Sequence, residues 1–242
     1  DAVLICTPDH WHDRMTIEAL EAGKAVYCEK PMVQEMNEGH EVVRVQQDTG
    51  GIVLVGSQHG SSILNKKAGE LLREGAIGVL NTVHGQDNRN SAIGAWNYSI
   101  PPDASPETID WEGFLGDAPD RSFDLDRFFR WRKYWDYGTG IPGDLFVHRF
   151  TGLHTATGSA GPKHIWATGG IRTWTDGREV PDVMTGVFEY PHTENHPGFT
   201  FTLEVNMAAG GGGGPALTFI GDEGIMEVHG DRVTVTRNLR SE

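Results

Sequence analysis

An acid and an imidazole stand four positions apart in this sequence, at Asp144 and His148. On a helix that turns about 100° per residue they share one stripe, and Phe146, Phe150 and Leu153 fall on the opposite side. Such a helix would pack through its aromatic face and present the two polar groups to a cleft. A neutral histidine whose tautomer is held by a carboxylate accepts protons near neutral pH. The pair therefore suits proton transfer from a hydroxyl that is being oxidised, and an ordinary helical Asp/His pair is the alternative.

A lysine and a threonine each follow a strand-like run of apolar residues. Lys30 comes after residues 24–28 and directly before a proline, which restricts the backbone at the lysine. Thr7 and Pro8 come after residues 2–6. Ligands of open α/β sheets bind at the carboxyl ends of the strands, where these residues would lie. We interpret both segments as parts of a ligand site; the alternatives are a surface lysine and a Thr-Pro pair that only begins a helix.

The elements that would position these residues alternate between strand and helix at the start of the chain. Strands are predicted at residues 2–6, 24–28 and 52–55, and helices between them include residues 33–48. The connections are long enough for the right-handed crossovers that parallel strands require. This is the α/β pattern, and it predicts the remainder of a parallel Rossmann-type sheet in a domain of residues 1–58.

The rest of the chain predicts a second domain, residues 59–242, of α+β type. It begins with a helix near 62–74 and continues with loops over 94–142 that are rich in Trp, Pro, Asp and Gly. A large, mostly antiparallel sheet is expected from the later alternating segments, at residues 79–84, 183–190, 199–207, 216–220 and 232–237. The glycine run at 210–214 lacks the Lys and Ser/Thr of a phosphate loop, so we interpret it as a mobile loop.

Composition excludes several classes of function. The 34 acidic and 20 basic residues give a net charge of −14, which disfavours nucleic acid and anionic membrane surfaces as partners. No run of about 18 apolar residues suggests a membrane span. The cysteines, Cys6 and Cys28, lie in strand-like runs and are expected to be buried thiols, and no histidine spacing typical of a metal site is present. We expect a cytoplasmic protein without a bound metal.

Five short motifs occur in an order that resembles the Gfo/Idh/MocA family, the relatives of glucose-fructose oxidoreductase and inositol 2-dehydrogenase. Each motif alone is weak, but their order is specific, and the resemblance covers nearly the whole chain. The motifs are Thr7-Pro8 with His12, Ala22-Gly23-Lys24, Glu29-Lys30-Pro31, Val55-Gly56-Ser57-Gln58, and Asp144 with His148.

The resemblance implies an NAD(P)-dependent oxidoreductase that transfers a hydride between nicotinamide and a secondary hydroxyl of a sugar or polyol. It implies that Lys30 bonds the reacting hydroxyl beside the nicotinamide, that His148 is the general base and that Asp144 orients the substrate. NAD or NADP would be lined by Thr7, Pro8, His12, Glu29, Lys30, Gln58, Trp131 and Arg132. A small carbohydrate substrate and a homo-oligomer, a dimer or tetramer joined through the second-domain sheet, are the expected partners.

Two departures from the family pattern keep alternatives open. The glycine-rich turn for the cofactor pyrophosphate would precede Asp1, so we expect that the natural N-terminus is missing here. Many relatives have an aspartate where this chain has Thr151. The alternatives are a relative that uses NAD for glycoside cleavage or elimination, and a truncated, non-catalytic domain for carbohydrate binding or oligomerisation.

Overall fold

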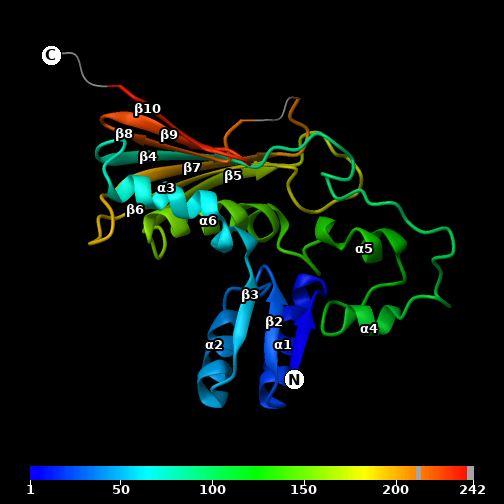
Figure 1. The fold of residues 1–242 in the computed structure, drawn as a ribbon. Helices are drawn as coiled ribbons and strands as arrows, with labels where there is room; N and C mark the ends of the chain where they lie inside the picture. The colour runs from blue at the N-terminus through cyan, green and yellow to red at the C-terminus, as the bar shows by residue number, and fades with distance from the viewer. Residues whose placement is uncertain (211–213, 239–242) are drawn as a thin grey trace. The chain divides into compact units, whose positions relative to one another are not determined.

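Three short parallel strands open the chain, and two helices connect them (Figure 1). In this computed structural model, which describes residues 1–210 and 214–238, the strands β1 (Ala2–Ile5), β2 (Ala25–Glu29) and β3 (Val53–Gly56) pair in the order β1-β2-β3. The helices are α1 (His12–Glu21) and α2 (Glu38–Thr49). Each helix ends where a glycine adopts a left-handed φ, +70° at Gly23 and +64° at Gly50, a conformation that side chains with a Cβ disfavour.

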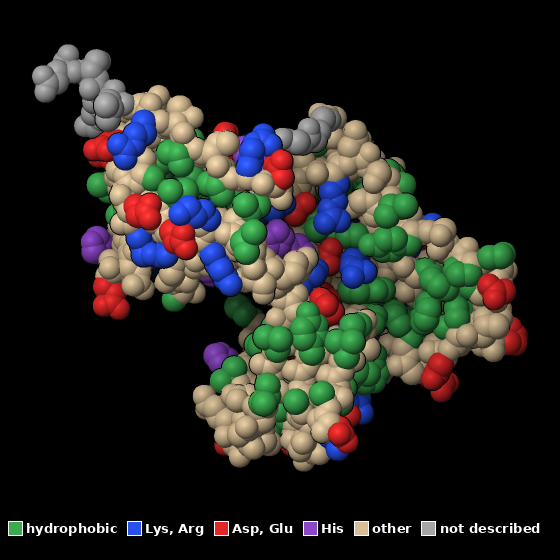
Figure 2. Space-filling view, viewed as in Figure 1, with side chains coloured by type: hydrophobic (Ala, Val, Ile, Leu, Met, Phe, Trp, Pro, Cys, Tyr) green, Lys and Arg blue, Asp and Glu red, His purple; other side chains and the backbone are tan. Residues whose placement is uncertain are grey.

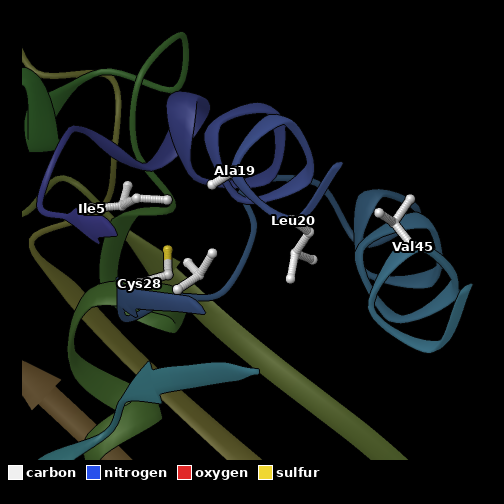
Figure 3. Packing of buried hydrophobic residues seen from close by; sticks show 6 residues of the cluster. Ile5, Ala19, Leu20, Cys28 and Val45 are labelled. Atoms are coloured by element: carbon white, nitrogen blue, oxygen red, sulfur yellow. The ribbon is translucent and has the colours of Figure 1, made fainter. Parts of the chain in front are cut away.

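The core between these strands and helices is small and apolar. Figure 3 shows Ile5 and Cys28, from β1 and β2, close to Ala19 and Leu20 of α1. Val26 of β2 and Val45 of α2 complete the buried cluster. Burial of each large aliphatic side chain contributes roughly 1.5–3 kcal/mol, which offsets the loss of backbone entropy in these elements. The structure therefore has the alternating strands and helices that the sequence predicts.

The loops rich in tryptophan also form a packed structure. They contain the short helices α4 (Trp111–Leu115) and α5 (Leu125–Phe129) and the single turn η3 (Trp131–Lys133). Another single turn, η1 (Asp9–Trp11), lies near the start of the chain, directly before α1. A second buried cluster gathers aromatic and aliphatic side chains from this region, Phe114, Leu115, Tyr134 and Tyr137. Tryptophan and tyrosine bury large areas, so a region with few regular elements can still be ordered.

A second sheet of seven strands is mostly antiparallel, which confirms the predicted fold class. Its order is β10-β9-β8-β4-β7-β6-β5, and only β4 and β7 are parallel among its pairs in the described residues. The strands are β4 (Leu80–Gln86), β5 (His164–Gly170), β6 (Val183–Tyr190), β7 (Phe199–Asn206), β8 (Leu217–Gly221), β9 (Gly224–Val228) and β10 (Val233–Arg237). Figure 1 shows helices α3 (Ile63–Arg73) and α6 (Val147–Thr157) on one side of this sheet.

The chain divides into two compact units that differ from a simple split in sequence. Unit 1 consists of Asp1–Gly56, Ala92–Asp144 and Thr175–Val180, and unit 2 of Ser57–Ser91, Leu145–Trp174 and Pro181–Glu242. The loops around α4 and α5 thus belong with the parallel sheet. The proposed domain boundary after residue 58 remains a prediction from the sequence.

Other expectations from the sequence have mixed outcomes. Cys28 is buried as expected, but Cys6 is exposed because it follows the last residue of β1; both are free thiols. The middle of the glycine run, 211–213, lies outside the described residues. On the face seen in Figure 2, acidic and basic side chains lie interspersed. None of the helices in the described residues has the length and apolar character needed to cross a membrane.

Candidate active site

Lys30 and Asp144 form a buried ion pair in unit 1. Lys30 follows the last residue of β2, and its Nζ lies 2.7 Å from Asp144 Oδ1 and 3.0 Å from the Asp144 carbonyl oxygen. The side chains are only 13% and 10% exposed, so water screens their attraction weakly. Two residues that lie 114 positions apart in the sequence therefore meet at the carboxyl end of a parallel strand, where ligands of such sheets bind.

Two further side chains hold the Asp144 carboxylate. Arg132 Nε donates to Oδ1 at 3.1 Å, and Trp96 Nε1 donates to Oδ2 at 3.1 Å. Burial alone would raise the pKa of Asp144, but the charges and hydrogen bonds of Lys30 and Arg132 hold that pKa below its usual value. Asp144 is therefore a carboxylate at neutral pH, with one oxygen facing two cations.

Trp96 occupies an uncommon backbone conformation in order to make this contact. Its φ is +65°, the one positive value of a residue other than glycine in the described chain, and its side chain is fully buried. Such a conformation costs on the order of 1–3 kcal/mol for a bulky residue and persists where the surroundings enforce it. Sequence reasoning missed Trp96, because no local pattern links it to an acid 48 positions away.

His148 lies in the second residue position of α6, directly after a π-helical segment, Pro142–Phe146, that contains Asp144. The wider π-helix changes the angular spacing that a regular helix would give. Of the predicted packing face, Phe146 and Leu153 are buried and Phe150 is half-buried. His148 belongs to unit 2, and Asp144 is the last residue of its segment of unit 1.

A cavity of about 450 Å³ in unit 2 has His148 in its wall. The ring of His59 packs against His148 with ring centroids 5.3 Å apart. Burial and the nearby charge of Arg149 lower the pKa of His59, so its imidazole is neutral at neutral pH. Arg149 is fixed by Asp87, 3.2 Å away, and by the Gln86 carbonyl oxygen, 2.8 Å away. The cavity therefore offers a dense set of hydrogen-bonding groups, as a polyhydroxylated ligand requires.

His59 was also missed by the sequence analysis. The only available signal was its place next to Gln58 in the fourth family-like motif. Gln58 begins the turn η2 (Gln58–Ser61) and belongs to unit 2, whereas the other residues proposed to line the cofactor belong to unit 1. Among the described residues, no group of three or more His, Cys, Asp or Glu side chains is arranged to hold a metal.

The residues expected at the cofactor do lie at strand ends in unit 1. Thr7 and Pro8 follow β1, and Glu29 is the last residue of β2. Thr7 Oγ1 is buried and has no hydrogen-bond partner in the described part of the chain, and Thr7 lines a hollow of about 590 Å³ with Pro8 and Trp11. A buried hydroxyl without a partner is costly unless a ligand or water satisfies it. The edge therefore fits a polar group of a bound cofactor.

Three of the expected cofactor residues contact other parts of unit 1. The guanidinium of Arg132 lies 4.1 Å above the Trp131 ring and binds Asp144, so this pair forms one wall of the Lys30 site. His12 is buried, and both of its ring nitrogens contact backbone carbonyl oxygens. Any influence of His12 on a cofactor would thus act through the backbone.

Comparisons with known proteins concern the family and the fold of the chain. Residues 1–57 match a family model described as "Oxidoreductase family, NAD-binding Rossmann fold", named for GFO, IDH and MocA, and residues 114–227 match the "GFO/IDH/MocA C-terminal domain". A 2,7-anhydro-N-acetylneuraminate hydratase of Mediterraneibacter gnavus is 30% identical over 46% of this chain and 27% of its own length. A levoglucosan dehydrogenase of Pseudarthrobacter phenanthrenivorans is 28% identical over 51% of this chain and 31% of its own length.

A solved structure gives the same result for the fold. The WlbA dehydrogenase of Bordetella pertussis, in complex with NADH and UDP-GlcNAcA, aligns over 100% of this chain and 64% of its own chain, with a TM-score of 0.71 and 19% identity. The matches to the two curated relatives span less than a third of their lengths. The two family models match successive parts of the chain, residues 1–57 with the parallel sheet and residues 114–227 with β5 to β9 of the second sheet. The chain therefore belongs to the Gfo/Idh/MocA oxidoreductase family.

Proposed function

We propose that this chain carries the catalytic residues of an NAD(P)-dependent oxidoreductase that acts on a secondary hydroxyl of a sugar or polyol. The observation that carries the proposal is the buried Lys30–Asp144 ion pair at the carboxyl end of β2, with Arg132 on the same carboxylate oxygen. An ammonium fixed at a strand end in a partly dry site stabilises negative charge that develops on a nearby oxygen. This is what a hydroxyl needs when it becomes a carbonyl.

The residues take separate roles in the proposal. Lys30 donates a hydrogen bond to the reacting oxygen, and Asp144 holds the Lys30 ammonium in place. His148 accepts the hydroxyl proton while the hydride leaves the carbon, and it returns that proton in the reverse direction. NAD or NADP, when bound, supplies the hydride acceptor or donor. The proposed lining residues for the cofactor are Thr7, Pro8, Glu29, Lys30, Gln58, Trp131 and Arg132, and His12, also expected there from the sequence, would act through the backbone that its ring holds.

The substrate class follows from the polar cavity around His148 and from the relatives. Imidazole, carboxamide and guanidinium groups line the cavity, which is typical of sites for several hydroxyls. The names of the two relatives state 2,7-anhydro-N-acetylneuraminate and levoglucosan as their substrates. We propose a carbohydrate of similar size as the substrate of this chain.

The central test is the substitution Lys30→Met in the full-length protein. Removal of the ammonium should lower kcat at least about a hundredfold, since one charged donor to the reacting oxygen is lost. Lys67→Met is the matched control, because Lys67 is an exposed lysine on α3 that pairs with Glu70. Circular dichroism checks that both variants fold. Full activity of a folded Lys30→Met enzyme would show that the assignment is wrong.

A second candidate function is a reaction with no net redox change. The first relative is named a hydratase, which favours a mechanism in which the hydride returns to the product. In that case a hydroxyl is oxidised, a bond next to the new carbonyl is broken or water is added, and the carbonyl is reduced again by the same hydride. Incubation with NAD and a candidate sugar distinguishes the two functions, since only the dehydrogenase accumulates NADH together with an oxidised sugar.

We also propose that the protein is a homo-oligomer in the cytoplasm, a dimer or tetramer joined through the seven-stranded sheet. The edge strand β5 is exposed along almost its whole length and carries Ile165 and Trp166, which are 59% and 56% exposed. Exposed apolar side chains on an unpaired edge favour association. Light scattering of the full-length protein tests the oligomer, and a monomer would contradict it. Imaging of the tagged protein tests the compartment.

A further inference from the structure

His12 begins α1 with its side chain only 1% exposed, and its ring connects two strand ends. Nδ1 lies 2.6 Å from the Pro31 carbonyl oxygen, which follows β2, and Nε2 lies 3.0 Å from the Thr7 carbonyl oxygen, which follows β1. Both oxygens belong to backbone carbonyls and can only accept a hydrogen bond. Each ring nitrogen must therefore carry a proton to make its contact favourable.

A neutral imidazole cannot satisfy this geometry. In either neutral tautomer, one nitrogen has a lone pair, which would face a carbonyl oxygen at 2.6 or 3.0 Å without a proton between them. Two electron-rich atoms so close in a buried site repel each other. The doubly protonated ring replaces that repulsion with a second, charge-assisted hydrogen bond.

His10, two residues away, shows the opposite arrangement in the same surroundings. Its Nε2 lies 2.9 Å from the Phe114 carbonyl oxygen, but its Nδ1 is buried and has no partner among the described residues. One donor and one unprotonated nitrogen are what a neutral ring presents. Burial lowers the pKa of His10, and the charge of His12 acts in the same direction. The two histidines thus differ in their ring nitrogens: both nitrogens of His12 have a carbonyl oxygen within hydrogen-bond distance, whereas only Nε2 of His10 has one in the described residues.

The charged groups near His12 can support a cation there. Asp9 is 3% exposed and accepts hydrogen bonds at Oδ2 from the Thr139 amide, at 3.0 Å, and from Thr139 Oγ1, at 2.7 Å. Burial raises the pKa of Asp9, whereas the Thr139 hydrogen bonds and the His12 charge oppose that rise. The charge of Lys30 also lowers the pKa of Asp9, and that of Asp144, which pairs with Lys30, raises it.

We propose that His12 is a doubly protonated clamp that ties the backbone after β1 to the backbone after β2 and thereby positions Lys30. Pro31 follows Lys30 directly, so the bond to its carbonyl oxygen fixes the backbone from which the ammonium extends. His12 is a positioning residue in this view and does not touch substrate. Its effect on catalysis rests on the proposed function, but its protonation state does not.

Nitrogen-15 NMR of the histidine rings in the full-length protein tests the protonation state directly. At about pH 7.5, we expect both ring nitrogens of His12 to be protonated, because each contacts a carbonyl oxygen, and only Nε2 of His10. His10 is the internal control in the same spectrum. A His12 ring with a single proton at that pH would overturn the proposal, whether or not the enzyme is a dehydrogenase.

Kinetics of His12→Phe tests the positioning role. Phenylalanine keeps a ring of similar size and removes both donors, so kcat should fall about tenfold or more while KM for the nicotinamide cofactor stays within about twofold. His12→Gln, which restores two N–H donors on one nitrogen, should recover part of the loss. His40→Gln, at an exposed histidine of α2, is the control.

The opposite kinetic pattern would contradict the clamp. A large rise in cofactor KM with unchanged kcat would mean that His12 contacts the cofactor itself. If the wild-type protein shows no dehydrogenase activity, the proposed function fails, and the NMR result still decides the clamp. If His12→Phe does not fold, the wild-type NMR spectrum and the His12→Gln variant remain as tests.

Discussion

The substitution Asp144→Asn tests how far the ion pair supports unit 1. Asparagine keeps the shape of the side chain, and its carbonyl oxygen can still accept from Trp96 Nε1, but Lys30 and Arg132 lose the charge that they share. Removal of one partner of a buried ion pair typically costs about 3–5 kcal/mol, because the remaining charge is left without compensation. Lys30 also donates to the Asp144 carbonyl oxygen, which the variant retains. We therefore expect the lower end of that range, about 3 kcal/mol.

Urea unfolding followed by the fluorescence of the tryptophans measures this loss. The pH dependence gives a second reading, whose sign follows from the lowered pKa of Asp144. Stability from a lowered carboxyl pKa is fully present above the unfolded value of about 3.9 and is lost as pH falls through the folded pKa. The difference between wild type and Asp144→Asn should thus be about 3 kcal/mol at neutral pH and should shrink as the pH falls below about 4.

A surface acid provides the control for this measurement. Asp117 pairs with Arg14 at 3.0 Å, but its side chain is 84% exposed, so Asp117→Asn should leave stability almost unchanged. The reasoning would be refuted if Asp144→Asn were as stable as the wild type at neutral pH. It would also be refuted if the loss of stability were the same at acid pH, because the carboxylate charge would then not be its cause.

Three further predictions concern parts of the fold outside the ion pair. Leu20→Ala should destabilise unit 1 by about 2–5 kcal/mol in calorimetry or urea unfolding, since the side chain is 1% exposed in the core; a smaller loss would show that the core relaxes around the cavity. Asp182→Ala should cost at least about 3 kcal/mol, because its buried carboxylate accepts three backbone amides at 2.6–2.7 Å; unchanged unfolding would contradict this. Burial raises the pKa of Cys28 to about 11, so mass spectrometry after brief iodoacetamide treatment at about pH 8 should find alkylation at the exposed Cys6 and very little at Cys28.

Strands buried by neighbouring helices were found from the sequence with errors of about one residue. The apolar run at 2–6 became β1, Ala2–Ile5, and the run at 52–55 became β3, Val53–Gly56. Two strands of the second sheet, β5 and β9, were not predicted. β5 is exposed on both faces and ends in two glycines, so the alternation of apolar and polar residues that marks a half-buried strand is weak there. β9 follows β8 after a two-residue turn, and its five residues merge with that strand in a window analysis.

The sequence likewise identified some residues of the candidate site and missed others. Lys30, Asp144 and the Thr7-Pro8 edge could be named from local motifs, because each motif is a few residues long and follows a strand or occupies one helix. Three contacts of the site could not be named from local motifs. They are the bonds of Trp96 and of Arg132 to Asp144 and the ring contact of His59 with His148. These contacts join positions that are distant in the sequence, and periodicity over a short window carries no information about them.

The sequence by itself determined the alternation of strands and helices, the motif order of the family and the candidate site residues Lys30, Asp144 and His148. Only the tertiary structure decided that the Asp144 carboxylate holds two cations and that both nitrogens of His12 contact carbonyl oxygens. The physical reason is that protonation and charge depend on burial and on partners within a few ångströms. Those partners are brought together by the packing of the folded chain, after local propensity has formed its elements.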